Sequence, residues 1–206
     1  MTRQPQQPRQ QEPERTYGAG DLLSIEGAWV LDLARSETME RFLELSGLPV
    51  EGIRAHVRAE RRYGGLNLIQ LDENTFTIHK RTCANNSTES FEIGEEKVTH
   101  SSVTGRRKSC VVSVPDFDSG GYMLSARTGA STGSELHMLE KRYVIDGGLS
   151  HVQEIHLQNL TSGGECTTTR TWFRVPMTEE HRTILANLPP QRSQRPLSQD
   201  CSPGRT

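Results

Sequence analysis

The chain has 206 residues, of which 33% are hydrophobic and 24% charged, and its formal net charge is −2 at pH 7. This length is enough for one or two domains, but the low apolar fraction favours a single domain of middling size. Because acidic and basic residues are interspersed and nearly balanced, there is no electrostatic signature of nucleic-acid binding. We therefore expect no nucleic-acid partner.

The four cysteines and seven histidines have none of the spacings of a metal site or a disulfide framework. The sequence contains no C-x-x-C pair and no H-E-x-x-H motif, so we expect no metal and no cofactor. The first residues lack the apolar core of a signal peptide, and no apolar run is long enough to span a bilayer. These features favour a cytoplasmic protein with reduced thiols.

The two ends differ in composition from the middle of the chain. Residues 1–21 are rich in Gln, Pro, Arg and Glu, and cannot bury enough apolar surface to offset the entropy lost on ordering. The segment 177–206 predicts a short helix over 178–188 followed by a second disordered tail. The folded domain is expected over residues 22–176.

The start of this domain predicts a strand and then two short helices. Apolar residues between 22 and 33 indicate a strand anchored by Trp29. Ser36 is the expected N-cap of an amphipathic helix ending near Gly47. A second helix follows Pro49, and its arginines point either to solvent, the usual case, or to the headgroups of an anionic membrane.

From residue 63 onward the pattern changes to strands separated by polar turns. Asp146-Gly147-Gly148 is a strong hairpin signal between two of them. This all-β pattern suits an up-and-down barrel or a sandwich. The predicted strands cover residues 66–71, 75–82, 88–93, 97–102, 108–114, 122–127, 136–145, 149–157 and 166–175.

The last of these strands, C-T-T-T-R-T-W-F-R-V, carries an arginine between β-branched and aromatic residues. Alternation places Thr168, Arg170 and Trp172 on one face. If that face lines a barrel interior, the guanidinium of Arg170 needs a partner such as a ligand carboxylate. The more common alternative is an exposed arginine, or one paired with a nearby acid.

Seven segments along the chain resemble one known family in their order and content. They are G-A-W-V-L (27–31), S-E-T-M-E-R-F-L (36–43), F-T-I-H-K-R-T (76–82), S-T-E-S-F-E-I-G-E-E (87–96), G-R-R-K-S-C-V-V-S-V (105–114), E-K-R-Y (140–143) and T-R-T-W (169–172). Together they resemble the intracellular lipid-binding proteins of the calycin superfamily, which include fatty-acid-binding and cellular retinoid-binding proteins. The resemblance covers roughly residues 23–175.

The resemblance implies a ten-stranded antiparallel up-and-down β-barrel, a closed β-clam, with a helix-turn-helix lid between the first two strands and disordered tails. It further implies a monomeric, non-enzymatic protein that binds and transports a long-chain fatty acid or similar hydrophobic carboxylate in its cavity. Transient contact of the lid with an anionic membrane surface is also expected. The scattered histidines, with no nucleophile and base at a recognised spacing, agree with a protein that is not an enzyme.

The resemblance also implies a binding site. By this resemblance, Arg142 and Arg170 would bind the ligand carboxylate together with Trp172, which stands where the family has a tyrosine. Alternation independently places Arg142 on an inward face, and two inward arginines repel each other strongly unless an anion or carboxylate sits with them. The residues expected to line the cavity or the lid are Met39, Phe42, Val57, Met138, Glu140 and Gln153.

Several residues depart from the family pattern. Glu140 stands where the family has an apolar residue, and if it neutralises Arg142 no ligand carboxylate is required. Ala84 takes the place of a phenylalanine gate, while His151 and Gln153 make the cavity more polar. The alternative to a lipid carrier is a scaffold protein, in which a degenerate barrel supports tails that bind a partner.

Overall fold

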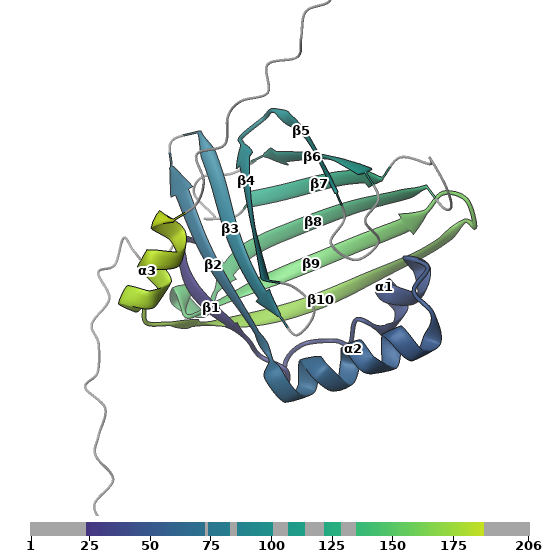
Figure 1. The fold of residues 1–206 in the computed structure, drawn as a ribbon, viewed down its shortest axis with the longest axis horizontal. Helices are drawn as coiled ribbons and strands as arrows, with labels where there is room; N and C mark the ends of the chain where they lie inside the picture. The colour runs from purple at the N-terminus through teal and green to yellow at the C-terminus, as the bar shows by residue number, and fades with distance from the viewer. Residues whose placement is uncertain are drawn as a thin grey trace, which may run out of the picture.

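The computed structural model describes residues 24–72, 74–82, 86–100, 107–113, 122–128 and 135–187 (Figure 1). Both predicted tails, apart from residues 177–187, and the expected gate position at Ala84 lie outside these ranges. No helix in the described ranges is both long and apolar enough to cross a membrane.

The described residues form one ten-stranded antiparallel sheet with the order β4-β3-β2-β1-β10-β9-β8-β7-β6-β5. A helix pair, α1 (Glu40–Leu45) and α2 (Val50–Tyr63), lies between β1 and β2, and α3 (Glu179–Ala186) follows β10. This architecture confirms the predicted fold class. The strands are β1 (Gly27–Leu31), β2 (Gly65–Asp72), β3 (Thr75–Thr82), β4 (Asn86–Glu92), β5 (Glu96–His100), β6 (Arg107–Ser113), β7 (Tyr122–Thr128), β8 (Leu136–Ile145), β9 (Ser150–Asn159) and β10 (Gly164–Val175).

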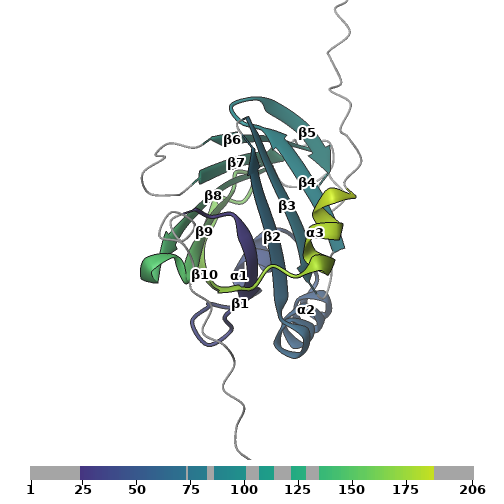
Figure 2. The same ribbon diagram turned by 90° about the vertical axis from the view of Figure 1, so that its left-hand side faces the viewer.

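The sheet curls into a half-barrel, with α1 and α2 across one open end (Figures 1 and 2). Alternate side chains of the strands point inward and form a core that includes Trp29, Phe76 and Phe91. On the outside, α3 packs its apolar side chains against Leu66 and Leu68 of β2. The two faces of the sheet are therefore both covered near β2, which explains the nearly continuous burial of that strand.

The two edge strands, β4 and β5, share no ladder in the described ranges, so the expected closure of the barrel by backbone hydrogen bonds is not found there. Contacts cross the gap instead. The amide of Gly94 donates to the carbonyl of Val112 (2.7 Å), and the Nζ of Lys97 on β5 donates to the carbonyl of Ser90 on β4 (2.5 Å). The two edges are thus joined by isolated contacts, one between backbone groups and one from a lysine side chain, rather than by a continuous ladder.

The first helix is shorter than predicted, and the expectation that Ser36 caps it is wrong. The helix begins at Glu40, after Met39. The hydroxyl of Ser36 instead donates to the carbonyl of Thr171 (3.2 Å) and accepts from its amide (2.9 Å). Serine hydroxyls bond readily to backbone groups outside helices, and here that preference ties the linker before the lid to β10.

The second helix begins directly after Pro49, as predicted, and covers the open end of the barrel. It buries Ile53 and Val57 against the interior. Its four arginines, at positions 54, 58, 61 and 62, are exposed on the opposite face. A helix with one apolar stripe and one basic face is the form expected of a lid on a hydrophobic cavity.

Candidate functional site

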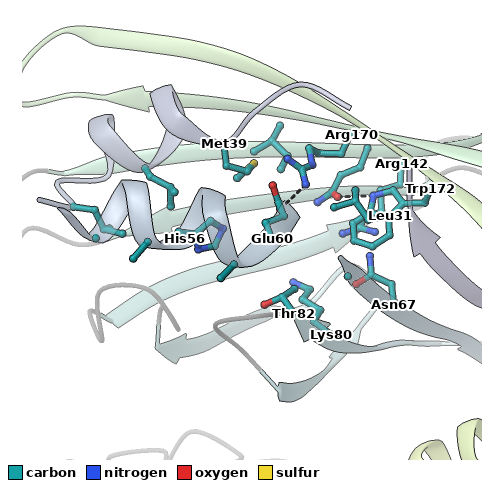
Figure 3. A pocket seen from close by; sticks show the side chains of 18 residues that line it. Leu31, Met39, His56, Glu60, Asn67, Lys80, Thr82, Arg142, Arg170 and Trp172 are labelled. Carbon is teal, nitrogen blue, oxygen red and sulfur yellow. Dashed lines mark hydrogen bonds and ion pairs between the residues drawn. The ribbon is translucent and has the colours of Figure 1, made fainter. Parts of the chain in front are cut away.

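A cavity of about 550 Å³ lies between the helix pair and the inner face of the sheet (Figure 3). Its volume is in the range of about 300–1,000 Å³ that is typical of ligand sites. The lid side is mostly apolar and the strand side carries most of the polar groups. The lining residues are Leu31, Met39, Leu43, Leu48, Gly52, Ala55, His56, Ala59, Glu60, Gly65, Asn67, Lys80, Thr82, Arg142, Gln153, Ile155, Arg170 and Trp172.

Five of the nine predicted site residues line this cavity, and four do not. Those at its wall are Met39, Arg142, Gln153, Arg170 and Trp172. Phe42 and Met138 pack instead against an apolar cluster around Leu136 and Leu157. Val57 is buried on the inner face of α2 without lining the cavity, and Glu140 lies behind Arg142 and contacts it directly.

Arg142 is held on the inner face of β8 by a glutamate two residues before it. Its Nε donates to the Oε1 of Glu140 at 2.5 Å, and both side chains are almost fully buried. Burial alone would raise the pKa of Glu140, but Arg142 and then Lys80 outweigh it, so the pKa lies below its ordinary value. The pair is therefore ionised and matched one to one.

Arg170 is held by the lid and by the chain that leads to it. One of its terminal nitrogens donates to the Oε1 of Glu60 on α2 (2.5 Å), and the other to the carbonyl of Glu37 (2.8 Å). Figure 3 shows this pair spanning the cavity from helix to strand. Sequence reasoning missed Glu60, because a contact between residues 110 positions apart leaves no local pattern.

Trp172 also has its polar atom occupied. Its indole N–H donates to the side-chain oxygen of Gln153 at 3.0 Å. A Cβ at Gly65 would lie 3.4 Å from the indole ring, so this glycine allows the close approach of β2 to the tryptophan. The predicted hydrogen-bond donor is thus engaged within the protein.

His151 lies behind this layer, between Trp29 and Trp172, with ring centroids 4.6 Å and 5.9 Å away. Burial, together with the charges of Arg142 and Arg174, lowers its pKa well below 6.5. The ring is therefore neutral, and its Nε2 lies 3.3 Å from a terminal nitrogen of Arg142. A neutral imidazole accepts at this nitrogen and so supports Arg142 without adding charge.

A second charged group, which sequence reasoning also missed, lies on the strands across the cavity. Glu89 on β4 accepts from Lys80 of β3 (3.0 Å) and from Lys108 of β6 (3.3 Å). Burial alone would raise the pKa of Glu89, but the charges and hydrogen bonds of the two lysines outweigh that effect and lower the pKa to about 2. Alternation from Phe76 and Phe91, both inward, could have placed Lys80 and Glu89 on the inner face.

Lys97 completes this second group. Its Nζ lies 5.2 Å from the centroid of the Phe91 ring, in addition to its bond to the carbonyl of Ser90. Burial lowers its pKa, an effect that Glu89 opposes and Lys108 strengthens. We call Lys80, Glu89, Lys97 and Lys108 the lysine cluster.

The charges at the cavity do not balance. Among the described residues, the charged side chains that line it, their ion-pair partners and Lys108, which shares Glu89 with Lys80, comprise four cations and three carboxylates. Arg142 and Arg170 each have a glutamate, whereas Lys80 and Lys108 share one. These seven side chains therefore carry a net charge of +1, on the side of the lysine cluster, and Lys97, which is not among them, adds to the positive potential there. The residues counted are Lys80, Lys108, Arg142, Arg170, Glu60, Glu89 and Glu140.

Comparisons with known proteins identify the fold. No family model and no curated protein sequence matches this chain. Among solved structures, a Schistosoma mansoni fatty acid binding protein in complex with arachidonic acid superposes with a TM-score of 0.56 at 17% identity, over 77% of this chain and 100% of that one. The REP1-NXSQ fatty acid transporter gives 0.54 at 18% identity, over 75% and 98%.

A third solved structure, the apo form of Caenorhabditis elegans lipid binding protein 8, gives a TM-score of 0.55 at 17% identity, over 73% of this chain and 94% of that one. The three matches span nearly the whole of each neighbour. The chain thus has the fold of the intracellular lipid-binding proteins, as the sequence motifs predicted.

Proposed function

We propose that this chain binds a hydrophobic carboxylate, such as a long-chain fatty acid, in the cavity beneath its helical lid. The observation that carries the proposal is the net charge of +1 among the groups at and directly behind the wall of a cavity whose lid side is apolar. A monoanionic ligand with a long apolar chain neutralises that charge and fills that space. Buried charges are stable only when they are paired.

The apolar chain supplies most of the binding free energy. Each buried CH₂ group contributes about 0.8 kcal/mol. The 14 CH₂ groups of a palmitoyl chain therefore contribute about 11 kcal/mol, which is comparable with the cost of association, on the order of 4–15 kcal/mol. The carboxylate then mainly selects which amphiphile is bound. The fold likeness to a fatty acid transporter and to a fatty acid binding protein in complex with arachidonic acid agrees with this choice.

A neutral polar lipid is the second candidate, and one observation favours it. Both arginines predicted to clamp a carboxylate are already paired, with Glu140 and Glu60, and the indole N–H of Trp172 is bound to Gln153. On that side of the cavity no further negative charge is needed. An alcohol headgroup suits such a neutral wall.

Calorimetric titration of the full chain with palmitic acid and with hexadecanol at neutral pH separates the two candidates. The chains of the two probes are equally long, so their apolar contributions are matched. We expect the acid to bind at least about tenfold more tightly, because an ion pair with a buried cation adds about 1.5 kcal/mol or more. Equal affinities would establish the neutral lipid instead.

As a carrier, the protein is expected to act as a cytoplasmic monomer that exchanges ligand through its lid. The exposed arginines of α2 are suited to transient contact with an anionic membrane surface. The rate at which the protein transfers the acid to vesicles tests this part of the proposal. The rate should be higher with vesicles that contain phosphatidylserine than with neutral vesicles. Transfer rates that do not depend on vesicle charge would contradict it.

A further inference from the structure

Three charged groups at the cavity wall are candidates for the ligand carboxylate: Arg142, Arg170 and Lys80. We infer that Lys80 receives it, by exchanging Glu89 for the ligand. This inference rests on the proposed function and specifies where the acid is held. Each candidate already contacts a glutamate. The three candidates differ in whether that glutamate still has a cation beside it after the ligand carboxylate has taken its place.

Arg142 is the least able to exchange. Its partner Glu140 is 5% exposed and lies behind the cavity wall rather than at it. A ligand that took Arg142 would leave the Glu140 carboxylate buried without its closest cation. Breaking a buried pair in this way is strongly unfavourable. The pair is better understood as a fixed part of the wall.

Arg170 exchanges only if the lid changes. Its partner Glu60 belongs to α2, and its second bond goes to the carbonyl of Glu37 in the linker before α1. A ligand carboxylate at Arg170 must displace Glu60 into solvent and so remove a contact that holds the lid on the sheet. Without that displacement, a second carboxylate would approach a pair that is already neutral, which offers it little attraction.

Lys80 exchanges without leaving any charge unmatched. When Lys80 turns to the ligand, Glu89 keeps its bond to Lys108. The result is two separate pairs, Lys80 with the ligand and Lys108 with Glu89, in place of two lysines that share one carboxylate. Lys97, the remaining cation of the cluster, adds to the positive potential around this exchange.

The geometry around Lys80 also suits a headgroup. Lys80 lines the cavity, and the register of β2 and β3 places Asn67 directly opposite it. Thr82, two residues further along the same face of β3, is also at the wall. A lysine on a flexible four-carbon stem follows a carboxylate more easily than an arginine fixed by two bonds. Figure 3 shows Lys80 and Thr82 together, across the cavity from Arg170.

The test compares how well each variant distinguishes palmitic acid from hexadecanol in calorimetric titrations of the full chain. Lys80→Met removes the charge and keeps an unbranched apolar side chain. The double variant Arg170→Met with Glu60→Gln is the matched control on the opposite wall, because it removes both charges of that ion pair. Lys108→Met removes the cation that holds Glu89 during the exchange, at a residue that does not line the cavity. Thermal unfolding of each variant shows that it is folded.

We expect the ratio of acid to alcohol affinity to fall about tenfold or more in Lys80→Met, since one ion pair is lost. The ratio should fall similarly in Lys108→Met, although this residue touches no ligand, because Lys80 is then needed by Glu89. It should stay near the wild-type ratio in the double variant Arg170→Met with Glu60→Gln, where no unpaired charge is left at the wall and any loosening of the lid weakens acid and alcohol alike. If Lys80→Met does not fold, Lys80→Gln takes its place.

A fall in the double variant of Arg170 and Glu60 with no change in Lys80→Met would overturn the inference while leaving the proposed function intact. A fall in Lys80→Met without one in Lys108→Met would overturn the exchange with Glu89. If the unmodified chain binds acid and alcohol equally, the proposed function fails and the inference fails with it. The three outcomes are therefore distinguishable from one set of titrations.

Discussion

The two charged walls of the cavity contain the same kinds of group in different proportions. On the wall formed by β8, β10 and α2, each arginine has a glutamate of its own. On the wall formed by β3, β4 and β6, two lysines share Glu89. The number of basic residues is therefore a poor guide to where an anion binds. What matters is how many of the charges are already matched.

Glu140→Gln is the strongest test of the arginine wall. It leaves the Arg142 guanidinium buried without a carboxylate, and removing one partner of a buried pair costs about 3–5 kcal/mol. We expect the free energy of unfolding in urea to fall by about this amount. The double variant Glu140→Leu with Arg142→Met removes both charges and should recover most of the loss. A single variant as stable as the unmodified chain would show that the pair is not closed to solvent.

Glu89→Gln tests the lysine wall in a pH-dependent way. The carboxyl pKa falls from 4.5 to about 2 on folding, so its contribution is fully present above pH 4.5 and is lost as the pH falls towards 2. A shift of this size corresponds to about 3 kcal/mol. The difference in unfolding free energy between the unmodified chain and the variant should therefore be largest at neutral pH and shrink between pH 4.5 and 2.

Glu51→Gln is the control for that experiment, because Glu51 is exposed on α2. The stability of the Glu51→Gln variant should equal that of the unmodified chain at every pH.

Glu89→Gln should also bind palmitic acid more tightly, since it releases both lysines for the ligand. If Glu89→Gln is still less stable than the unmodified chain at pH 2, the loss of stability comes from the shape of the glutamine side chain and not from the lost charge.

Glu60→Gln should have the smallest effect of the three on global stability. Glu60 is 15% exposed, so Arg170 is partly solvated once the pair is lost. We expect a loss of about 1–2 kcal/mol, concentrated in the lid, as faster hydrogen exchange of the amides of α2. The exposed pair of Arg41 and Glu44 gives a matched control, and Glu44→Gln should change stability by less than about 0.5 kcal/mol. Unchanged exchange in α2 would mean that the pair does not hold the lid.

Local sequence patterns predicted the strands and the second helix because each depends on neighbours in the chain. Alternation located β3 and β8 with their observed bounds, and Pro49 marked the start of α2. The Ser36 cap failed because its hydroxyl bonds to β10, a partner that local sequence does not reveal. Burial of Arg142 beside Glu140 was foreseen as one possibility, since both lie on one face of a single strand.

The rest of the site could not be predicted in the same way. The contact of Glu60 with Arg170 depends on how α2 crosses the barrel. The sharing of Glu89 depends on β4 and β6 approaching each other across the unpaired edge. Alternation indicates that Lys80 and Glu89 point inward, but it does not give the number of cations around one carboxylate.

The missing ladder between β4 and β5 has a consequence for self-association. Edge strands carry unpaired amides and carbonyls that can add a strand from another molecule and so start aggregation. Here the curl of the sheet turns its two edges towards each other, and the amine of Lys97 reaches across to a carbonyl of β4. A half-buried lysine on an edge strand opposes the docking of a foreign strand, which would have to displace it. The lysine cluster thus has two effects: it adds positive charge at the cavity, and it hinders another molecule from pairing with the edge strands β4 and β5.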